Sequence, residues 1–138
     1  MNKTQRKAFD LILPALSLIF LAGILTLFQP CGPREDGSWM SCHWAGRAAA
    51  GVAGAMLLLS VLRMLVRPDA KRGLDLALMV LSVLAVLLPG RLIGLCMMRD
   101  MRCHTLTAPF TSLLSALTAL AAAFDLIVSI RREKRDEA

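Results

Sequence analysis

Residues 48–66 read AAAGVAGAMLLLSVLRMLV, a run of 19 residues in which Arg63 is the only charged side chain. A run of this length and composition is typical of an α-helix that crosses a lipid bilayer, which needs about 20 consecutive, mainly apolar residues. Comparable runs lie on both sides of it, at residues 11–29, 74–95 and 106–130. The sequence therefore predicts an all-α membrane protein with four transmembrane helices.

The composition of the whole chain agrees with this prediction. Hydrophobic residues make up 57% of the 138 residues, against roughly 45–50% in soluble domains. Only short polar connections separate the four runs, so we expect a single transmembrane domain over residues 1–138. The first run lacks the small-residue cleavage pattern of a signal peptide, and we expect it to be retained as a span.

The distribution of basic residues predicts the orientation of the chain. Lys and Arg are enriched on the cytoplasmic side of membrane proteins. The two tails and the second connection carry eleven of them, whereas the first and third connections with their flanks carry five. We therefore expect both termini in the cytoplasm, in a bacterial inner membrane, with the basic rim against anionic lipids. The net charge of +6 accompanies no nucleic-acid motif, so nucleic acid is not an expected partner.

The first and third connections repeat one short motif. Met-x-Cys-His occurs at residues 40–43 and again 61 residues later at residues 101–104, and the cysteines that precede it, Cys31 and Cys96, are 65 residues apart. Repeats of this kind are usual in membrane transporters. The sequence thus predicts two repeated helical hairpins, at about residues 8–66 and 74–130.

Small residues recur at a spacing of four in the two returning helices of these hairpins. They are Gly46, Ala50 and Gly54, and Ser115, Ala119 and Ala123. Because small residues let helix backbones approach closely in lipid, we expect the second and fourth helices to pack against each other at the centre. The same faces would also suit a homo-oligomer.

Charged residues occur inside the predicted spans, near the inner surface: Asp10, Arg63, Asp75 and Asp125. The sequence leaves three interpretations open for them: pairing with one another, extension to the headgroups, or a proton relay or ion path. Near the outer surface, Pro89 and Gly90 predict a kink or an early helix end close to Leu88. Arg91 then either orients the outer loop, attracts an anion or reaches the headgroups.

All four cysteines lie in the predicted outer connections, where an oxidising environment favours disulfides. The spacing favours two local bridges, Cys31 with Cys42 and Cys96 with Cys103. Each bridge would fasten a loop too short to form its own core, and Trp39 and Trp44 would anchor the first loop at headgroup level.

Two alternatives to structural disulfides stay open for the outer cluster of soft side chains, namely metal binding and thiol–disulfide exchange. It offers ligands for Cu(I), since thiolate, thioether and imidazole groups favour that ion: Met40, Cys42, His43, Met97, Met98, Met101, Cys103 and His104. His43 and His104 would alternatively ligate a haem iron from both sides. The second alternative is thiol–disulfide exchange, as in four-span quinone-linked oxidases, although the Cys-x-x-Cys spacing of those enzymes is absent.

No nucleophile elbow, phosphate-binding loop or catalytic carboxylate pair is found in the sequence, which favours a non-enzymatic protein.

The motifs at Met40–Ala45, Leu92–Cys96 and Met101–Pro109 resemble the bacterial family of unknown function numbered 4418, over roughly residues 10–130. The resemblance implies the four-span architecture and the outer cysteine motifs. It implies no activity. Members of the family are often encoded near exporter-type ABC transporters, so the resemblance implies an accessory role beside such a transporter or another membrane protein.

Overall fold

The computed structural model describes residues 3–27, 32–94, 100 and 103–138. These residues form α1 (Lys3–Thr26), α2 (Ser41–Leu65), α3 (Pro68–Leu87), the short π-helix η1 (Cys103–Thr107) and α4 (Ala108–Asp136). Within these ranges no β-strand is formed, and an isolated bridge joins Pro89 to Ile93. The described chain is therefore all-helical, as the sequence predicts.

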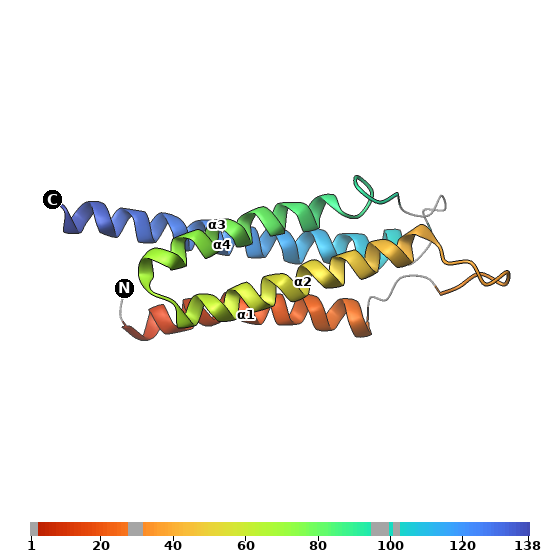
Figure 1. Ribbon diagram of the computed structural model, residues 1–138, viewed down its shortest axis with the longest axis horizontal. Coiled ribbons are helices and arrows are strands. Elements are labelled where there is room, and N and C mark those ends of the chain that lie inside the picture. Colours follow the sequence, from red (N-terminus) through yellow and green to blue (C-terminus); the bar gives the residue numbers. More distant parts are fainter. Residues whose placement is uncertain (1–2, 28–31, 95–99, 101–102) are drawn as a thin grey trace.

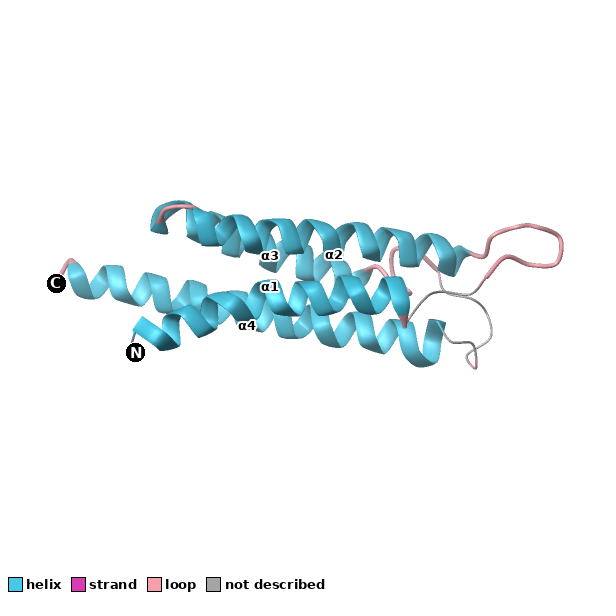
Figure 2. Ribbon diagram, turned by 90° about the horizontal axis from the view of Figure 1, so that it is seen from below, coloured by secondary structure: helices cyan, strands magenta, loops and turns pink. Residues whose placement is uncertain are grey.

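The four α-helices lie side by side, and both termini are at the same end (Figure 1). Residues 32–40, which precede α2, and residues 88–94, which follow α3, are at the opposite end, and the view from below shows the same arrangement (Figure 2). Each helix packs mainly against two others, so that α1 and α3 both contact α2 and α4. The packing thus closes a ring of antiparallel neighbours.

The prediction that the second and fourth helices pack together is wrong, because α2 and α4 are not among the helix pairs in substantial contact in the described chain. Gly54 illustrates the reason. A Cβ atom added there would meet nothing within 4 Å, so this small residue does not mark a close approach between helices. The buried face of α2 includes Ala45, Gly46, Ala49 and Ala53, and α2 packs mainly against α1 and α3.

Proline sets the boundaries of α3. Arg67 precedes Pro68 and has extended backbone angles, φ −66° and ψ 157°, because a residue before proline is disfavoured in the helical region. Pro68 then starts α3, where its missing N–H costs little, and Asp69 lies in the first turn, near the positive end of the helix dipole.

The third predicted span ends early, as Pro89 and Gly90 indicate. α3 stops at Leu87, and Gly90 adopts a positive φ of 89° that suits glycine. The Gly90 N–H donates to the Ile93 carbonyl at 3.1 Å, which closes a tight turn. The predicted end of this span at Leu95 is therefore too late, and Arg91 lies exposed in the turn instead of continuing the helix.

The faces buried between the helices carry small hydroxyl side chains beside apolar ones, and many large apolar side chains face outward. Ser17, Ser82, Thr111 and Thr118 are almost fully buried, and each donates its hydroxyl to the carbonyl of the residue four positions earlier. A buried hydroxyl needs such a partner, and the helix supplies it locally. These four hydroxyl groups are thus satisfied even where the helices pack closely.

Two of the described helical segments are long and apolar enough to cross a membrane. They are Ser41–Leu65 and His104–Asp136, while the apolar part of α1, Asp10–Thr26, is shorter. The structure is thus compatible with a membrane protein through α2 and α4.

The buried positions of α1 and α3 recur at an offset of 65 residues, the same as that of Cys31 and Cys96. Each helix buries a leucine, a serine and a third apolar residue: Leu13, Ser17 and Phe20 in α1, and Leu78, Ser82 and Ala85 in α3. Ser17 donates to Leu13 at 2.9 Å and Ser82 donates to Leu78 at 2.7 Å. The two helices therefore present matching faces to the interior.

The buried positions of α2 recur in η1 and α4 at an offset of 62, whereas the Met-x-Cys-His motifs are 61 residues apart. The matched buried residues are Ala45, Ala49, Ala53, Met56 and Ser60, and Thr107, Thr111, Ser115, Thr118 and Ala122. η1 runs from the cysteine of the second motif to Thr107, the first matched buried residue, and a π-helical turn takes in an extra residue. The π-helix thus accounts for the shift of one position.

Gly23 of α1 provides space for an aromatic ring of α4. Phe110 packs near Phe20, with ring centroids 6.5 Å apart and planes tilted by 58°. A Cβ atom added at Gly23 would overlap the Phe110 ring. The contact between α1 and α4 therefore depends on a residue without a side chain.

We predict that Gly23→Ala lowers the free energy of unfolding by about 1–3 kcal/mol, the usual cost of overpacking. Gly51→Ala is the matched control, because a Cβ at this exposed helical position meets nothing within 4 Å. This control should be neutral or stabilising, since alanine is the better helix former. Thermal unfolding in detergent, followed by circular dichroism, measures both. Equal stability of the two variants would show that Phe110 does not need this space.

Candidate functional site

The guanidinium of Arg63, in the last turn of α2, lies between all four α-helices. Its side chain is 0% exposed. Nε pairs with Oδ1 of Asp75 from α3, Nη2 pairs with Oδ2 of Asp125 from α4, and Nη1 lies 3.6 Å from Oδ1 of Asp10 from α1. Lys71 of α3 pairs with the same Asp10 oxygen. We call these five residues the Arg63 cluster.

The order of the helices brings the cluster together. Arg63 comes just before the connection from α2 to α3, and Lys71 and Asp75 follow in the first turns of α3. The first half of α1 and the last part of α4 lie at the same end of the molecule, which adds Asp10 and Asp125 (Figure 1). The cluster therefore ties the helices together at the end that carries both termini.

Burial makes these ion pairs important for stability. Removing a charged group from water costs several kcal/mol, and a partner with good geometry must compensate for that cost. Arg63 has a carboxylate close to each of its three guanidinium nitrogens. Loss of the guanidinium would leave Asp75, of which 2% of the side chain is exposed, without its cation.

Two carboxylates share one edge of the guanidinium. Nε and Nη2 are neighbouring donors on the same edge, which a single carboxylate commonly occupies with both of its oxygens. Here Asp75 takes Nε with one oxygen and Asp125 takes Nη2 with one oxygen. Their negative charges are thus held close together and depend on the same cation.

A second ion pair lies nearer the surface at the same end. Arg72 Nη1 is 2.5 Å from Glu133 Oε2, and both side chains are partly exposed. Exposed pairs are screened by water and contribute at most about 1 kcal/mol each. This pair joins α3 to α4 without the energetic importance of the buried cluster.

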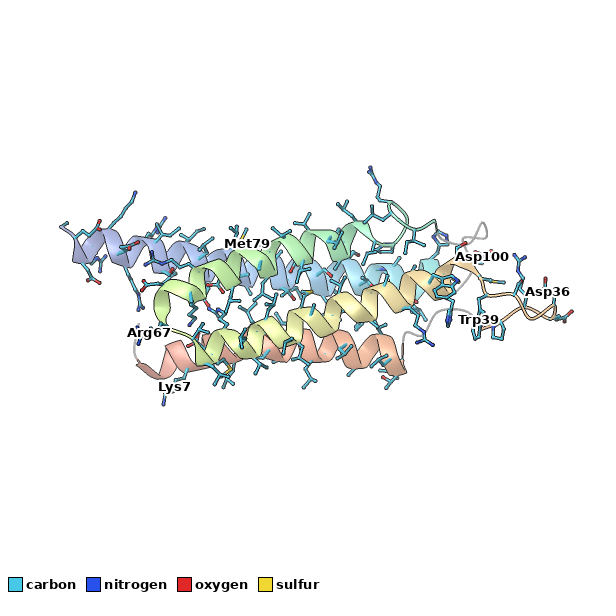
Figure 3. The ribbon with its side chains drawn as sticks, viewed as in Figure 1. Lys7, Asp36, Trp39, Arg67, Met79 and Asp100 are labelled. Carbon is cyan, nitrogen blue, oxygen red and sulfur yellow. The ribbon has the colours of Figure 1, made fainter. Side chains whose placement is uncertain are left out.

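A pocket of about 390 Å³ opens beside the cluster. Its lining combines polar and apolar residues: Lys7, Asp10, Leu11, Arg63, Met64, Val66 and Lys71. Lys7 is exposed and points away from the helices, and Arg67 lies at the same end (Figure 3). The pocket therefore connects the buried guanidinium with the surface at the end of the termini.

The members of the cluster correspond to one another in the repeat. Asp10 and Asp75 are 65 residues apart, the offset of the matched faces of α1 and α3. Arg63 and Asp125 are 62 residues apart, the offset that relates the buried faces of α2 and α4. The pair Asp10 and Asp75 is thus acidic in both halves of the chain, whereas the pair Arg63 and Asp125 is basic in the first half and acidic in the second.

The opposite end of the molecule contains an aromatic group around His43. Its ring lies 4.0 Å from the Trp39 ring, centroid to centroid, and 5.8 Å from the Trp44 ring in an edge-on arrangement. Both tryptophans are about half exposed or more. Figure 3 shows Trp39 at this end, together with Asp36 and Asp100.

The predicted outer cysteine and metal residues are only partly described. Met40 caps α2, Cys42 is buried in its first turn, and His104 is half-buried in η1. The other predicted ligands lie outside the described residues: Cys31, Cys96, Met97, Met98 and Met101, together with the side chain of Cys103. The two disulfides, the Cu(I) site and the haem site therefore stay predictions.

The first outer connection has a local turn around Asp36. Ser38 donates its hydroxyl to Asp36 Oδ1 at 2.7 Å and its backbone N–H to the same oxygen at 3.0 Å. These hydrogen bonds hold the pKa of Asp36 below its ordinary value of 3.8. Gly37, with a φ of 79°, makes the reversal of the chain between them.

Sequence reasoning identified Asp10, Arg63, Asp75 and Asp125 as charged residues near one surface but left pairing and solvation both open. The structure pairs them. Lys71 was assigned only to the basic rim, and its contact with Asp10 was missed. The offset of 65 residues between Asp10 and Asp75, equal to that of the leading cysteines, was a signal for their equivalence.

We predict that Arg63→Ala lowers the free energy of unfolding by about 3–5 kcal/mol, because three carboxylates lose their buried cation. Arg72→Ala is the matched control and should cost about 1 kcal/mol or less, since its pair is exposed. Denaturant unfolding in detergent measures the two changes. Similar losses for both variants would mean that the cluster does not stabilise the helices.

The model of one protein family matches residues 13–128 of the chain. The comparison with curated proteins gives no match. The comparison with solved structures gives none either. The matched region includes α2, α3, η1 and most of α1 and α4, with Arg63, Lys71, Asp75 and Asp125 of the cluster. The chain therefore belongs to the family described as Domain of unknown function (DUF4418).

Proposed function

We propose that this protein is a four-span membrane protein that acts as a non-enzymatic accessory subunit of a larger membrane complex. The observation that carries the proposal is the outward-facing apolar surface of every α-helix. Leu18, Leu58, Val80 and Leu120, one from each helix, are all more than half exposed. An apolar surface of this extent is unusual for a soluble monomer and suits contact with lipid or a membrane partner.

The shorter apolar parts of α1 and α3 also fit this arrangement. Their charged turns, with Asp10 and Asp75, lie at one end and are paired with Arg63. Neutralisation by a partner lowers the cost of placing such residues near lipid. A bilayer can also thin locally around a short apolar segment at a modest cost.

The charge distribution supports an orientation with both termini in the cytoplasm. The two termini lie at the end that holds Lys7, Arg67 and the Arg63 cluster. Basic residues concentrate on the cytoplasmic side of membrane proteins, where they also meet anionic lipids. In this orientation the cysteine-containing segments face the outside of a bacterial inner membrane, where the two predicted disulfides would form.

The accessory role follows from how little of the chain lies outside the helices. Among the described residues outside the helices, the longest continuous segment is 32–40, which leaves little room for a catalytic domain. Such a protein acts most simply by contacting another membrane protein through its helix faces or outer loops. An exporter-type ABC transporter is the expected partner.

The topology gives a direct prediction. Ser38→Cys should react with a membrane-impermeant maleimide in intact cells, because Ser38 is exposed and lies between Asp36 and Trp39, which Figure 3 shows at the end opposite the termini. Ala70→Cys, exposed beside the connection from α2 to α3, should react only after the membrane is permeabilised. The wild-type chain gives the background from its own cysteines. Labelling of both variants in intact cells would contradict the proposed orientation.

The partner gives a second prediction. The tagged chain, cross-linked in native membranes and then purified, should bring down another membrane protein in a fixed ratio. Excess untagged chain, present in the same membranes before cross-linking, should lower the recovery of that protein. Mass spectrometry identifies the partner. Recovery of the tagged chain alone would contradict the accessory role, and recovery of untagged copies of the same chain would indicate a homo-oligomer instead.

A further inference from the structure

The Arg63 cluster contains more negative than positive charge. Asp10, Asp75 and Asp125 supply three carboxylates, while Arg63 and Lys71 supply two cations. Lys71 pairs with Asp10, whereas the guanidinium edge of Arg63 pairs with both Asp75 and Asp125. One carboxylate of this pair therefore has no counter-charge of its own within the cluster.

This charge count includes the charged groups that each α-helix places near Asp75 and Asp125. α1 contributes Asp10, with Lys7 at the exposed rim of the pocket, α2 contributes Arg63, and α3 contributes Lys71. Arg72 of α3 and Glu133 of α4 neutralise each other nearer the surface. The excess negative charge thus stays with Asp75 and Asp125.

We propose that Asp75 and Asp125 form a proton-binding site, in which the two carboxylates share one exchangeable proton above the guanidinium edge of Arg63. Two carboxylates held close together, one of them almost fully buried, do not both ionise readily, and such a pair takes up a proton as a unit. In the protonated pair, one carboxylate keeps its ion pair with Arg63, and the neutral carboxyl group donates a hydrogen bond to the other carboxylate. No other atom is gained or lost.

The shape of the site favours a proton over a metal ion. The shared edge is already occupied by a guanidinium, which a second bulky cation would have to displace. In the part of the chain that the structure describes, no group of three or more His, Cys, Asp or Glu side chains is arranged to hold a metal ion. The pocket of about 390 Å³ that reaches Arg63 and Asp10 provides the route by which a proton enters from the end of the termini.

The site adds a function to the proposed accessory subunit, namely a response to the proton concentration on the cytoplasmic side. The pair joins α3 to α4 through Arg63 of α2, so loss of the shared proton places two like charges between packed helices. Raising the pH should therefore loosen this end of the molecule. The inference rests on the four-span proposal only for its assignment of this end to the cytoplasm.

Infrared spectroscopy of the full chain in lipid vesicles tests the proposal. At neutral pH the wild-type protein should show the carbonyl band of a protonated carboxyl group, which shifts on exchange into heavy water. Asp75→Asn and Asp125→Asn should each abolish the band, because the remaining carboxylate then has Arg63 to itself.

Asp69→Asn is the matched control, because Asp69 is an exposed carboxylate on the same helix, outside the cluster. The control should keep the band of the wild-type protein. Titration of the wild-type chain to alkaline pH should remove the band and lower the thermal stability together, a result that needs no variant to fold.

Absence of the band from the wild-type protein, or its survival in both Asn variants, would overturn the proposal. Absence of the band together with stabilisation by sodium or potassium would assign the site to a metal cation instead. Maleimide labelling reads the topology separately, so a failure of the four-span proposal and a failure of the proton site give different results.

Discussion

Among the residues that the structure describes, the guanidinium of Arg63 is the group that contacts a charged side chain from each of the other three α-helices. A buried cation has to be neutralised, so the helices must meet where their carboxylates can reach it. This requirement sets the register of α1, α3 and α4 against α2 at the end that carries the termini. At the other end, by contrast, helix packing depends on small residues and on the ring of Phe110 beside Gly23.

Between these two ends, the interior follows a different rule from that of a soluble protein. Four buried hydroxyl side chains lie on the inner faces beside leucine, alanine and phenylalanine and bond to their own helix, namely those of Ser17, Ser82, Thr111 and Thr118. Many other leucine and valine side chains face outward. Because these four hydroxyls are satisfied within their own helices, the packing needs no hydrogen bonds between helices at these positions. Among the described residues, the buried charged side chains, Arg63 and Asp75, lie together near the end that carries the termini. The ion pairs, and not the hydroxyl groups, therefore specify how the helices align.

The two halves of the chain share this design with one alteration. Asp10 and Asp75 occupy equivalent places, whereas Arg63 corresponds to Asp125 through the extra residue in η1. The replacement of an acidic by a basic side chain at one equivalent position makes the association of the halves electrostatically favourable. It also leaves two carboxylates on one guanidinium edge, which is the basis of the proposed proton site.

The sequence by itself determined the helical class, the position of each helix to within several residues and the early end of α3, because apolar run length and proline act locally. It also indicated that Asp10, Arg63, Asp75 and Asp125 lie near one surface. Only the tertiary structure decided that these residues meet, that Lys71 joins them and that α2 and α4 lie diagonally opposite each other in the ring. Those outcomes depend on the order of helices around the ring and on a π-helical turn that shifts α4 by one position, neither of which hydropathy or residue spacing encodes.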